Sequence, residues 1–178
     1  MVVVSSRARG YITLLIISGL ETHFVPVISQ KAKYALRALV ALAKAGDSLV
    51  IGEIAARKNI PRKFLEQILL ELKHHGIVQS RRGKLGGYSL LMSPDRITYG
   101  QVLRIIDGPI APLPCLSRIA YRRCSDCATE ETCEIRRVFA RVAESAREVL
   151  DRTTIADSVS ASLLAGEAEA ETPAMARL

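Results

Sequence analysis

The first part of the chain repeats apolar residues with the spacing of α-helices. One such stretch covers residues 30–45 and stops at a Gly-Asp pair. A shorter stretch begins at Ile51 and breaks at Asn59, and a third runs from Pro61 to Gly76. The pattern therefore predicts three core helices in close succession.

The third predicted helix has two unlike faces. Its apolar stripe consists of Phe64, Leu65, Ile68, Leu69 and Leu72. The opposite face carries Lys63, Glu66 and Gln67. Two short helices joined by a tight turn, the second with a polar outer face, are typical of a helix-turn-helix.

A small β-hairpin is predicted directly after this helix. Residues 77–81 and 88–91 form its strands, and Gly86 and Gly87 can adopt the positive φ that a tight turn requires. The turn region gathers three positive charges, those of Arg81, Arg82 and Lys84. A basic hairpin that follows a helix-turn-helix is typical of a winged-helix protein.

Two further helices are predicted in the second half. Thr98 and Gln101 have the spacing of a capping box and open a helix that ends at Gly108. A proline-containing loop follows, which cannot be helical as a whole. A long helix then begins at about Glu130, with an apolar stripe made of Ile135, Val138, Phe139, Val142, Ala146, Val149 and Leu150.

Heptad spacing along this long helix indicates a partner. Ile135, Val142 and Val149 lie seven residues apart, so the stripe can run along a second helix for several turns. We expect that second helix to be the symmetry mate in a homodimer. The alternative is burial of the stripe against the chain's own core.

These elements predict a mainly α-helical fold, a winged helix-turn-helix with a small β-hairpin wing and a long C-terminal dimerisation helix. The expected divisions are an N-terminal extension (1–26), a DNA-binding domain (27–108), a cysteine-rich sensor loop (109–129), the dimerisation helix and its end (130–157) and a flexible tail (158–178). Arg7 and Arg9 precede an apolar run, as in a signal peptide. No small-residue cleavage site follows, and the run is too short to span a bilayer, so no membrane partner is expected.

Composition and charge narrow the class further. Of the 178 residues, 49% are hydrophobic but only 4% are aromatic, which favours an aliphatic, helical core. The net charge of +7 is concentrated in the first half, since residues 27–92 hold twelve Lys and Arg but four Asp and Glu. Such an excess fits a polyanion, either nucleic acid or an anionic membrane surface. The helix-turn-helix pattern favours double-stranded DNA.

All four cysteines of the chain fall in one short stretch, as Cys115, Cys124, Cys127 and Cys133. Thiolates gathered in this way suit an iron–sulfur cluster, of 2Fe–2S or 4Fe–4S type, or a zinc ion. A thiol–disulfide switch without metal is the third possibility. The sequence alone leaves these three open.

Residues from about Ile28 to Asp157 resemble the Rrf2 family of bacterial winged-helix transcription regulators, which includes iron–sulfur and nitric-oxide sensors. The resemblance rests on Lys33-Tyr34-Ala35-Leu36-Arg37, Ile54-Ala55, Phe64-Leu65-Glu66-Gln67-Ile68-Leu69, Arg82-Gly83, Gly86-Gly87-Tyr88 and Ile155-Ala156-Asp157. It implies a homodimer that binds promoter DNA, most simply as a repressor. Each recognition helix would enter a major groove and each wing the neighbouring minor groove.

The resemblance also assigns individual residues to the DNA interface. It places Lys63, Phe64, Glu66 and Gln67 at the groove-facing positions of the recognition helix and Arg82 at the wing arginine. Glu can accept a hydrogen bond from cytosine and Gln can pair with adenine, while arginine suits a narrow minor groove. The neighbouring basic residues Arg62, Arg81 and Lys84 complete the expected set.

The cysteine segment departs from the family pattern. Well-known members bind a cluster through three cysteines with a shorter first gap, and one subgroup adds a histidine three residues after the last cysteine. Here eleven residues separate Cys115 from Cys127, and Arg136 stands at the histidine position. Cys124 is therefore the expected fourth ligand, unless a residue of the partner subunit serves.

Rival functions are an electron carrier, a zinc-stabilised regulator without redox sensing and a partner-binding module. The sequence has no phosphate-binding glycine loop, and its three histidines lie outside the cysteine segment. An electron carrier would also leave the basic wing without a purpose. We therefore expect a cytoplasmic DNA-binding regulator and not an enzyme.

Overall fold

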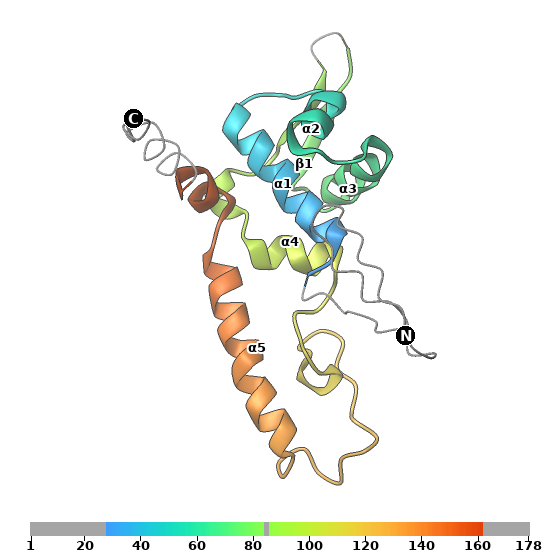
Figure 1. Cartoon of the computed structure of the whole chain (residues 1–178), viewed down its shortest axis with the longest axis vertical. Helices are drawn as coiled ribbons and strands as arrows, with labels where there is room; N and C mark the ends of the chain where they lie inside the picture. Colours follow the sequence, from blue (N-terminus) through green and yellow to red (C-terminus); the bar gives the residue numbers. More distant parts are fainter. Residues whose placement is uncertain (1–27, 84–85, 162–178) are drawn as a thin grey trace, which may run out of the picture.

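The computed structural model describes residues 28–83 and 86–161 of the chain (Figure 1). Its regular elements are α1 (Gln30–Ala45), α2 (Ile51–Lys58), α3 (Arg62–His74), β1 (Val78–Arg81), β2 (Gly87–Leu90), α4 (Tyr99–Ile106) and α5 (Glu134–Arg152). Short 3-10 turns lie at Pro94–Arg96 and Pro114–Leu116. The predicted mainly helical class with one antiparallel hairpin is confirmed.

α1 lies at the centre of the core. The Ser29 hydroxyl accepts a hydrogen bond from the Ala32 N–H at 3.0 Å and begins the helix, while Gly46 ends it with a φ of 67°. Its alanine and leucine face packs on α2, α3 and α4. Small alanines let these helices approach closely, so the core is aliphatic, as the composition predicted.

The hairpin is attached to the loop between α1 and α2. Leu49 and Tyr88 exchange two backbone hydrogen bonds, of 2.9 and 2.8 Å. Gly87 makes this approach possible, since a Cβ there would lie 2.5 Å from the Leu49 carbonyl oxygen. The Lys73 ammonium also donates to the Ser80 hydroxyl at 2.7 Å, which joins α3 to β1. The wing is therefore held in a fixed relation to α3.

α5 extends away from the winged-helix domain, and the cysteine segment runs beside it (Figure 1). After α5 the chain returns to the core. The Tyr99 N–H donates to the Thr153 carbonyl at 2.9 Å, and the Ile155 N–H donates to Ile97 at 2.9 Å. Ile155 itself is fully buried. The C-terminal end of α5 is thus fastened to the winged-helix domain.

Two boundaries differ from prediction. α5 begins at Glu134 and not near Glu130, because the Cys133 side chain caps the helix by accepting from the Arg136 N–H at 3.4 Å. Residues 155–161 are helical, so the described part of the predicted tail, 158–161, continues a helix. The predicted extension 1–26 and the rest of the tail lie outside the described residues.

Candidate functional site

The polar outer face predicted for the third helix is found on α3. Leu65, Ile68, Leu69 and Leu72 are fully buried, which turns the opposite face of the helix outward. Arg62, Lys63, Glu66 and Gln67 are all exposed there. Arg62 Nε lies 3.3 Å from Glu66 Oε1, an exposed pair that holds the carboxylate on this face.

Phe64 occupies a different position from these polar neighbours. Its ring is half-buried and packs edge-to-face on Tyr34 of α1, with ring centroids 5.8 Å apart. A ring engaged in this contact orients the recognition helix on α1. An apolar stripe could not reveal this, because it does not separate a core position from one at the edge of the core.

The wing presents its arginines to solvent. Arg81 at the end of β1 and the following Arg82 are exposed, and Gly83 has a φ of 109°. Gly86 is also required, because a Cβ there would lie 2.5 Å from the Arg81 carbonyl oxygen. Lys84, the third predicted basic contact of the wing, lies outside the described residues.

Positive charge extends beyond the predicted contacts onto α1 and α2. Burial first, and then the positive charges of Lys44, Arg37 and Arg57, lower the pKa of Lys58. Like charges that crowd in this way favour a polyanionic partner. The net charge of residues 27–92 indicated an excess of positive charge, but the sequence did not show that part of this excess lies on α1 and α2.

All four cysteines line one cavity of about 790 Å³, together with Arg122 and Arg123. Cys115 lies buried in the 3-10 turn at Pro114–Leu116, and the other three thiols are partly exposed. The sulfur atoms of Cys127 and Cys133 are 3.5 Å apart. The four predicted ligands therefore line the same cavity, and two of them, Cys127 and Cys133, are in contact.

The Cys127 and Cys133 thiols titrate as a pair. Cys127 donates its S–H to Cys133, and hydrogen bonding to Cys133 and then to Cys124 raises the pKa of Cys127 to about 12. The Arg136 N–H, and next the Cys127 S–H, lower the pKa of Cys133. Of the two thiols, Cys133 is therefore the one that loses its proton first.

This pairing predicts selective alkylation in reduced, metal-free protein. At pH 8 iodoacetamide should modify Cys133 at least about tenfold faster than Cys127, because only the thiolate reacts. Peptide mass spectrometry over a time course measures both rates. Replacing Cys133 by serine should speed the alkylation of Cys127. Faster reaction of Cys127 in the unmodified protein would contradict the pairing.

Fit to a metal depends on how the thiols are spaced. Metal–sulfur bonds of about 2.3 Å in a tetrahedral site hold sulfur atoms about 3.8 Å apart. The Cys127–Cys133 pair matches that spacing. Across residues 28–83 and 86–161, however, no three His, Cys, Asp or Glu side chains lie close enough together to hold a metal ion. The structure therefore shows one pair of thiols, Cys127 and Cys133, at a spacing close to that of metal ligands.

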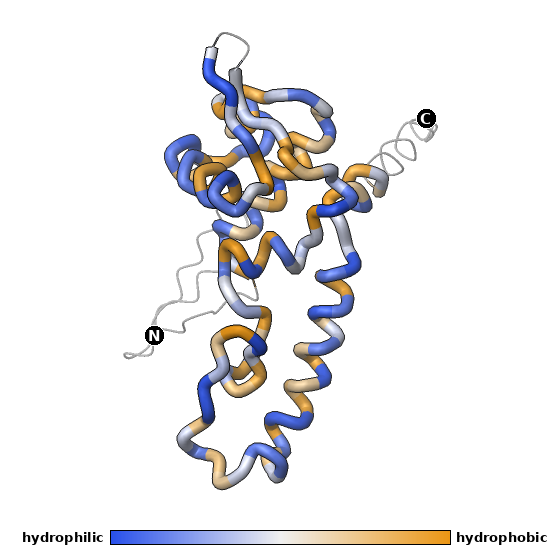
Figure 2. The backbone as a smooth tube through the Cα atoms, turned by 180° about the vertical axis from the view of Figure 1, so that it is seen from behind, coloured by the Kyte–Doolittle hydropathy of each residue, from blue (hydrophilic) through white to orange (hydrophobic). Residues whose placement is uncertain are grey.

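Five of the seven residues of the apolar stripe of α5 are exposed. The exposed fractions are 63% for Ile135, 61% for Val138, 52% for Val142 and 63% for Val149. Figure 2 shows hydrophobic and hydrophilic residues alternating along the helix, as in an amphipathic helix. Burial against the chain's own core is therefore confined to the end of the stripe, where Leu150 is half-buried and packs on the core. A continuous exposed apolar face marks an interaction surface.

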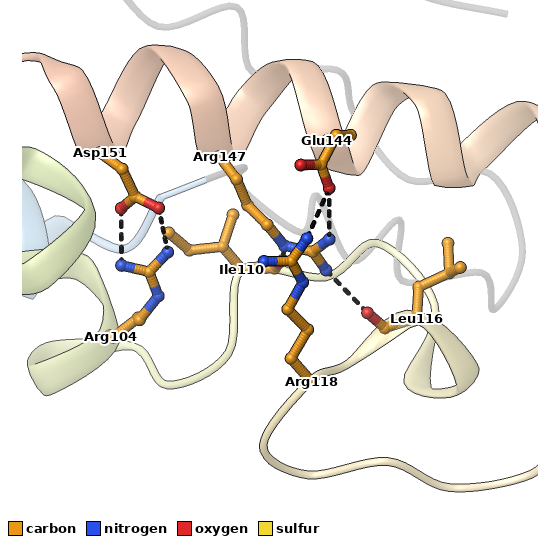
Figure 3. A network of polar contacts seen from close by, with 7 residues as sticks. All are labelled: Arg104, Ile110, Leu116, Arg118, Glu144, Arg147 and Asp151. Carbon is orange, nitrogen blue, oxygen red and sulfur yellow. Dashed lines mark hydrogen bonds and ion pairs between the residues drawn. The ribbon is translucent and has the colours of Figure 1, made fainter.

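The inner face of α5 is attached to the rest of the chain by polar contacts (Figure 3). Arg104 of α4 donates two hydrogen bonds of 2.7 Å to the Asp151 carboxylate. Gly100 leaves room for that carboxylate, because a Cβ there would lie 1.9 Å from Asp151 Oδ1. Arg147 reaches the backbone carbonyls of Ile110 and Leu116.

The Arg104–Asp151 contact predicts a dependence of stability on pH. Hydrogen bonding to Arg104 holds the pKa of the Asp151 carboxyl below its ordinary value. The pair therefore stabilises the fold above the unfolded carboxyl pKa of about 3.9, and this contribution is lost as the pH falls through the folded-state pKa. Asp151→Asn should lower the free energy of unfolding at pH 7 by up to about 1 kcal/mol and by less at pH 3. Urea unfolding at both pH values tests this; equal losses would contradict it.

A family model and the curated relatives point to the same protein family. Residues 28–161 match Rrf2, described as an iron-dependent transcriptional regulator. An rrf2-like HTH-type transcriptional regulator of Rhodobacter capsulatus is 49% identical over 140 residues, covering 76% of this chain and 93% of the relative. CymR of Bacillus subtilis, an HTH-type transcriptional regulator, is 36% identical over 145 residues, covering 80% and 95%.

Solved structures agree with the sequence relatives. CymR, the global cysteine regulator of B. subtilis, superposes with a TM-score of 0.62 at 33% identity and covers 75% of this chain and 95% of its own. IscR of T. potens gives 0.60 at 27% identity, covering 82% and 91%. The curated relatives are named as regulators, which agrees with the expectation of a regulator and not an enzyme. None of the helices in the described part of the chain has the length and apolar content needed to cross a bilayer.

Proposed function

The chain belongs to the Rrf2 family of transcriptional regulators, and from this premise we propose that it binds promoter DNA as a homodimer whose affinity is set by its four-cysteine site. One observation carries the sensing part of the proposal. All four cysteines of the chain line a single cavity next to the first turn of α5. The helix that starts at this cavity ends on the DNA-binding domain.

The DNA interface of the proposal consists of the outer face of α3 and the wing. Lys63, Glu66 and Gln67 would reach base edges in the major groove, with Arg82 in the adjacent minor groove. Arg62, Arg81 and Lys84 would contact phosphates, and Phe64 would hold α3 in place on Tyr34. The apolar face of α5 would bury itself against the same face of a second copy.

For the cysteine site we propose an iron–sulfur cluster held by Cys115, Cys124, Cys127 and Cys133. Four thiolates are a full ligand set, so neither a histidine nor a partner residue is required. The N–H of Arg136 and the start of α5 favour negative charge on Cys133, as a thiolate ligand needs. When bound, a cluster supplies a redox-active centre that oxidants can alter or remove.

The chain's own residues convert that change into DNA affinity. Gathering the thiols at one centre would fix Cys115 relative to Cys133, the cap of α5. Releasing them would free the segment between these two residues, and the direction of α5 would change. Since the two half-sites are read about 34–36 Å apart, a small rotation of α5 misplaces one recognition helix on the duplex.

Anaerobic purification tests the metal directly. We expect a coloured protein with visible absorption and bound iron and sulfide, whose iron content gives the cluster type. Cys127→Ser should lose the colour, while Ser125→Ala, which changes a neighbouring exposed residue, should keep it. Colourless wild-type protein with stoichiometric zinc would contradict the cluster and favour a zinc-stabilised regulator.

A disulfide switch is a second candidate, favoured by the 3.5 Å separation of the Cys127 and Cys133 sulfur atoms. A peroxide would accept two electrons and two protons from the two thiols, forming one S–S bond and water. Metal-free wild-type protein that binds DNA and loses affinity on peroxide treatment, with a Cys127–Cys133 disulfide in the peptide map, would support this candidate.

A further inference from the structure

Arg104, Arg118 and Arg147 form ion pairs between α5 and the rest of the chain or within α5, and of these three side chains Arg147 is the least exposed. Its side chain is only 11% exposed. Arg147 Nη2 donates to the Leu116 carbonyl at 2.7 Å and Nε donates to the Ile110 carbonyl at 3.3 Å, while Nη1 lies 3.4 Å from Glu144 Oε2 (Figure 3). One guanidinium thus joins α5 to two points of the segment that leads into the cysteines.

Ile110 precedes the 3-10 turn that carries Cys115, and Leu116 is the last residue of that turn. Leu116 follows Cys115 directly, and Cys115 is 7% exposed. A backbone movement at Cys115 therefore displaces the Leu116 oxygen that Arg147 holds. A buried guanidinium that loses its acceptor destabilises the fold. The segment around Cys115 and helix α5 therefore move together, so that Arg147 keeps its hydrogen bonds.

One helical turn further along the same face, α5 is bound to the DNA-binding domain. Asp151, four residues after Arg147, accepts both hydrogen bonds from Arg104 of α4. Arg147 and Asp151 therefore connect α5 to the cysteine segment and to the winged helix at adjacent points. The Arg118–Glu144 pair is also near Arg147, but both side chains are more than 60% exposed, so water screens it.

We propose that Arg147 is the positioning residue that couples the cysteine site to the direction of α5. The coupling rests on the proposed function, since it presupposes that the state of the cysteines alters DNA affinity. Arg147 touches neither the thiols nor DNA in this role. It transmits displacement of Cys115 through the Leu116 carbonyl to the helix whose far end is held by α4.

The test compares full-length Arg147→Met, which keeps the length of the apolar stem, with Arg147→Lys and Arg118→Met. The DNA probe is the duplex that wild-type protein selects from random sequence. Its dissociation constant is measured by fluorescence anisotropy on anaerobically purified protein and on the same sample after EDTA and ferricyanide remove the metal. The ratio of the two constants is the coupling.

We expect a wild-type ratio of at least about fivefold in either direction. The ratio should fall to near one in Arg147→Met, be partly restored in Arg147→Lys, which keeps the charge without the forked donors, and be unchanged in Arg118→Met. In metal-free protein, alkylation of buried Cys115 should also become at least about fivefold faster in Arg147→Met, which reports release of the segment independently of DNA.

The outcomes separate the two proposals. A wild-type ratio of one would overturn the proposed sensing function and, with it, the coupling. A wild-type ratio that survives in Arg147→Met, or that falls equally in Arg118→Met, would overturn the coupling alone. If Arg147→Met fails to fold by circular dichroism, Arg147→Lys decides, and an unchanged ratio with unchanged Cys115 alkylation in that variant overturns the coupling.

Discussion

Replacing Val142 by aspartate is expected to separate the proposed homodimer into monomers and to weaken binding of a two-fold symmetric promoter site by at least about 100-fold. Val142 lies in the middle of the exposed apolar face of α5. A two-fold axis would bring the new carboxylate close to its own copy in a water-poor interface. Each dimer would then bury two carboxylates that repel each other. Sedimentation velocity measures the mass, and fluorescence anisotropy measures DNA affinity.

Arg137→Glu is the matched control for this substitution. Arg137 is an exposed residue of α5 on the side away from the apolar stripe, so it also tests the effect of added negative charge. It should remain dimeric and keep its affinity within about threefold. A Val142→Asp protein that stays dimeric would show that α5 does not form the dimer interface.

Replacing Arg82 by alanine is expected to weaken operator binding by roughly 5- to 150-fold, the range of one good groove contact of 1–3 kcal/mol. The slope of log affinity against log salt should fall by about one, because one cation leaves the interface. Arg152→Ala, which removes an exposed arginine from the last position of α5, should change neither quantity. Titrations at four salt concentrations give both numbers.

Gln67→Ala should act differently from Arg82→Ala. Loss of the Gln67 amide should weaken the preference for one base at a single position of the operator. The slope of log affinity against log salt should stay unchanged, because Gln67 carries no charge. A panel of single-base operator variants measures this. If neither substitution alters DNA binding, the winged helix serves as a scaffold for another partner and the proposed interface is wrong.

Much of the DNA-binding half follows from local sequence physics. The predicted helix 30–45 agrees with α1 because its periodicity is uninterrupted and Ser29 and Gly46 supply both caps. The hairpin was predictable from glycines and strand-forming residues around basic positions. Local rules succeed here because neighbouring residues determine these elements.

Local sequence rules fail where a side chain bonds to a group far away along the chain, or where the bonding group is an unusual one. α5 starts at Glu134 because a thiol, which is not an ordinary capping group, caps it. The role of Arg147 has no sequence signal, because its acceptors are backbone carbonyls 31 and 37 residues away. The helix from Ile155 had a signal that was missed, since Thr154 and Asp157 cap each other through hydrogen bonds of 2.8 and 3.2 Å.

The cysteine site lies between these cases. Its four residues were evident from the sequence, and the structure gathers them around one cavity with Cys127 and Cys133 in contact. The hydrogen bonding that makes Cys133 the thiolate of the pair depends on the start of α5, which the sequence misplaced. The gathering of the four cysteines was therefore predictable, while the contact between the Cys127 and Cys133 thiols was not.

The dissociation constant for operator DNA, measured on one anaerobic sample before and after removal of its metal at a fixed salt concentration, tests the central claim most directly. We predict a change of at least about fivefold in wild-type protein and no change on the same treatment of Cys127→Ser. Equal affinity of the wild-type protein in both states would contradict a regulator whose DNA binding is set by its cysteine site.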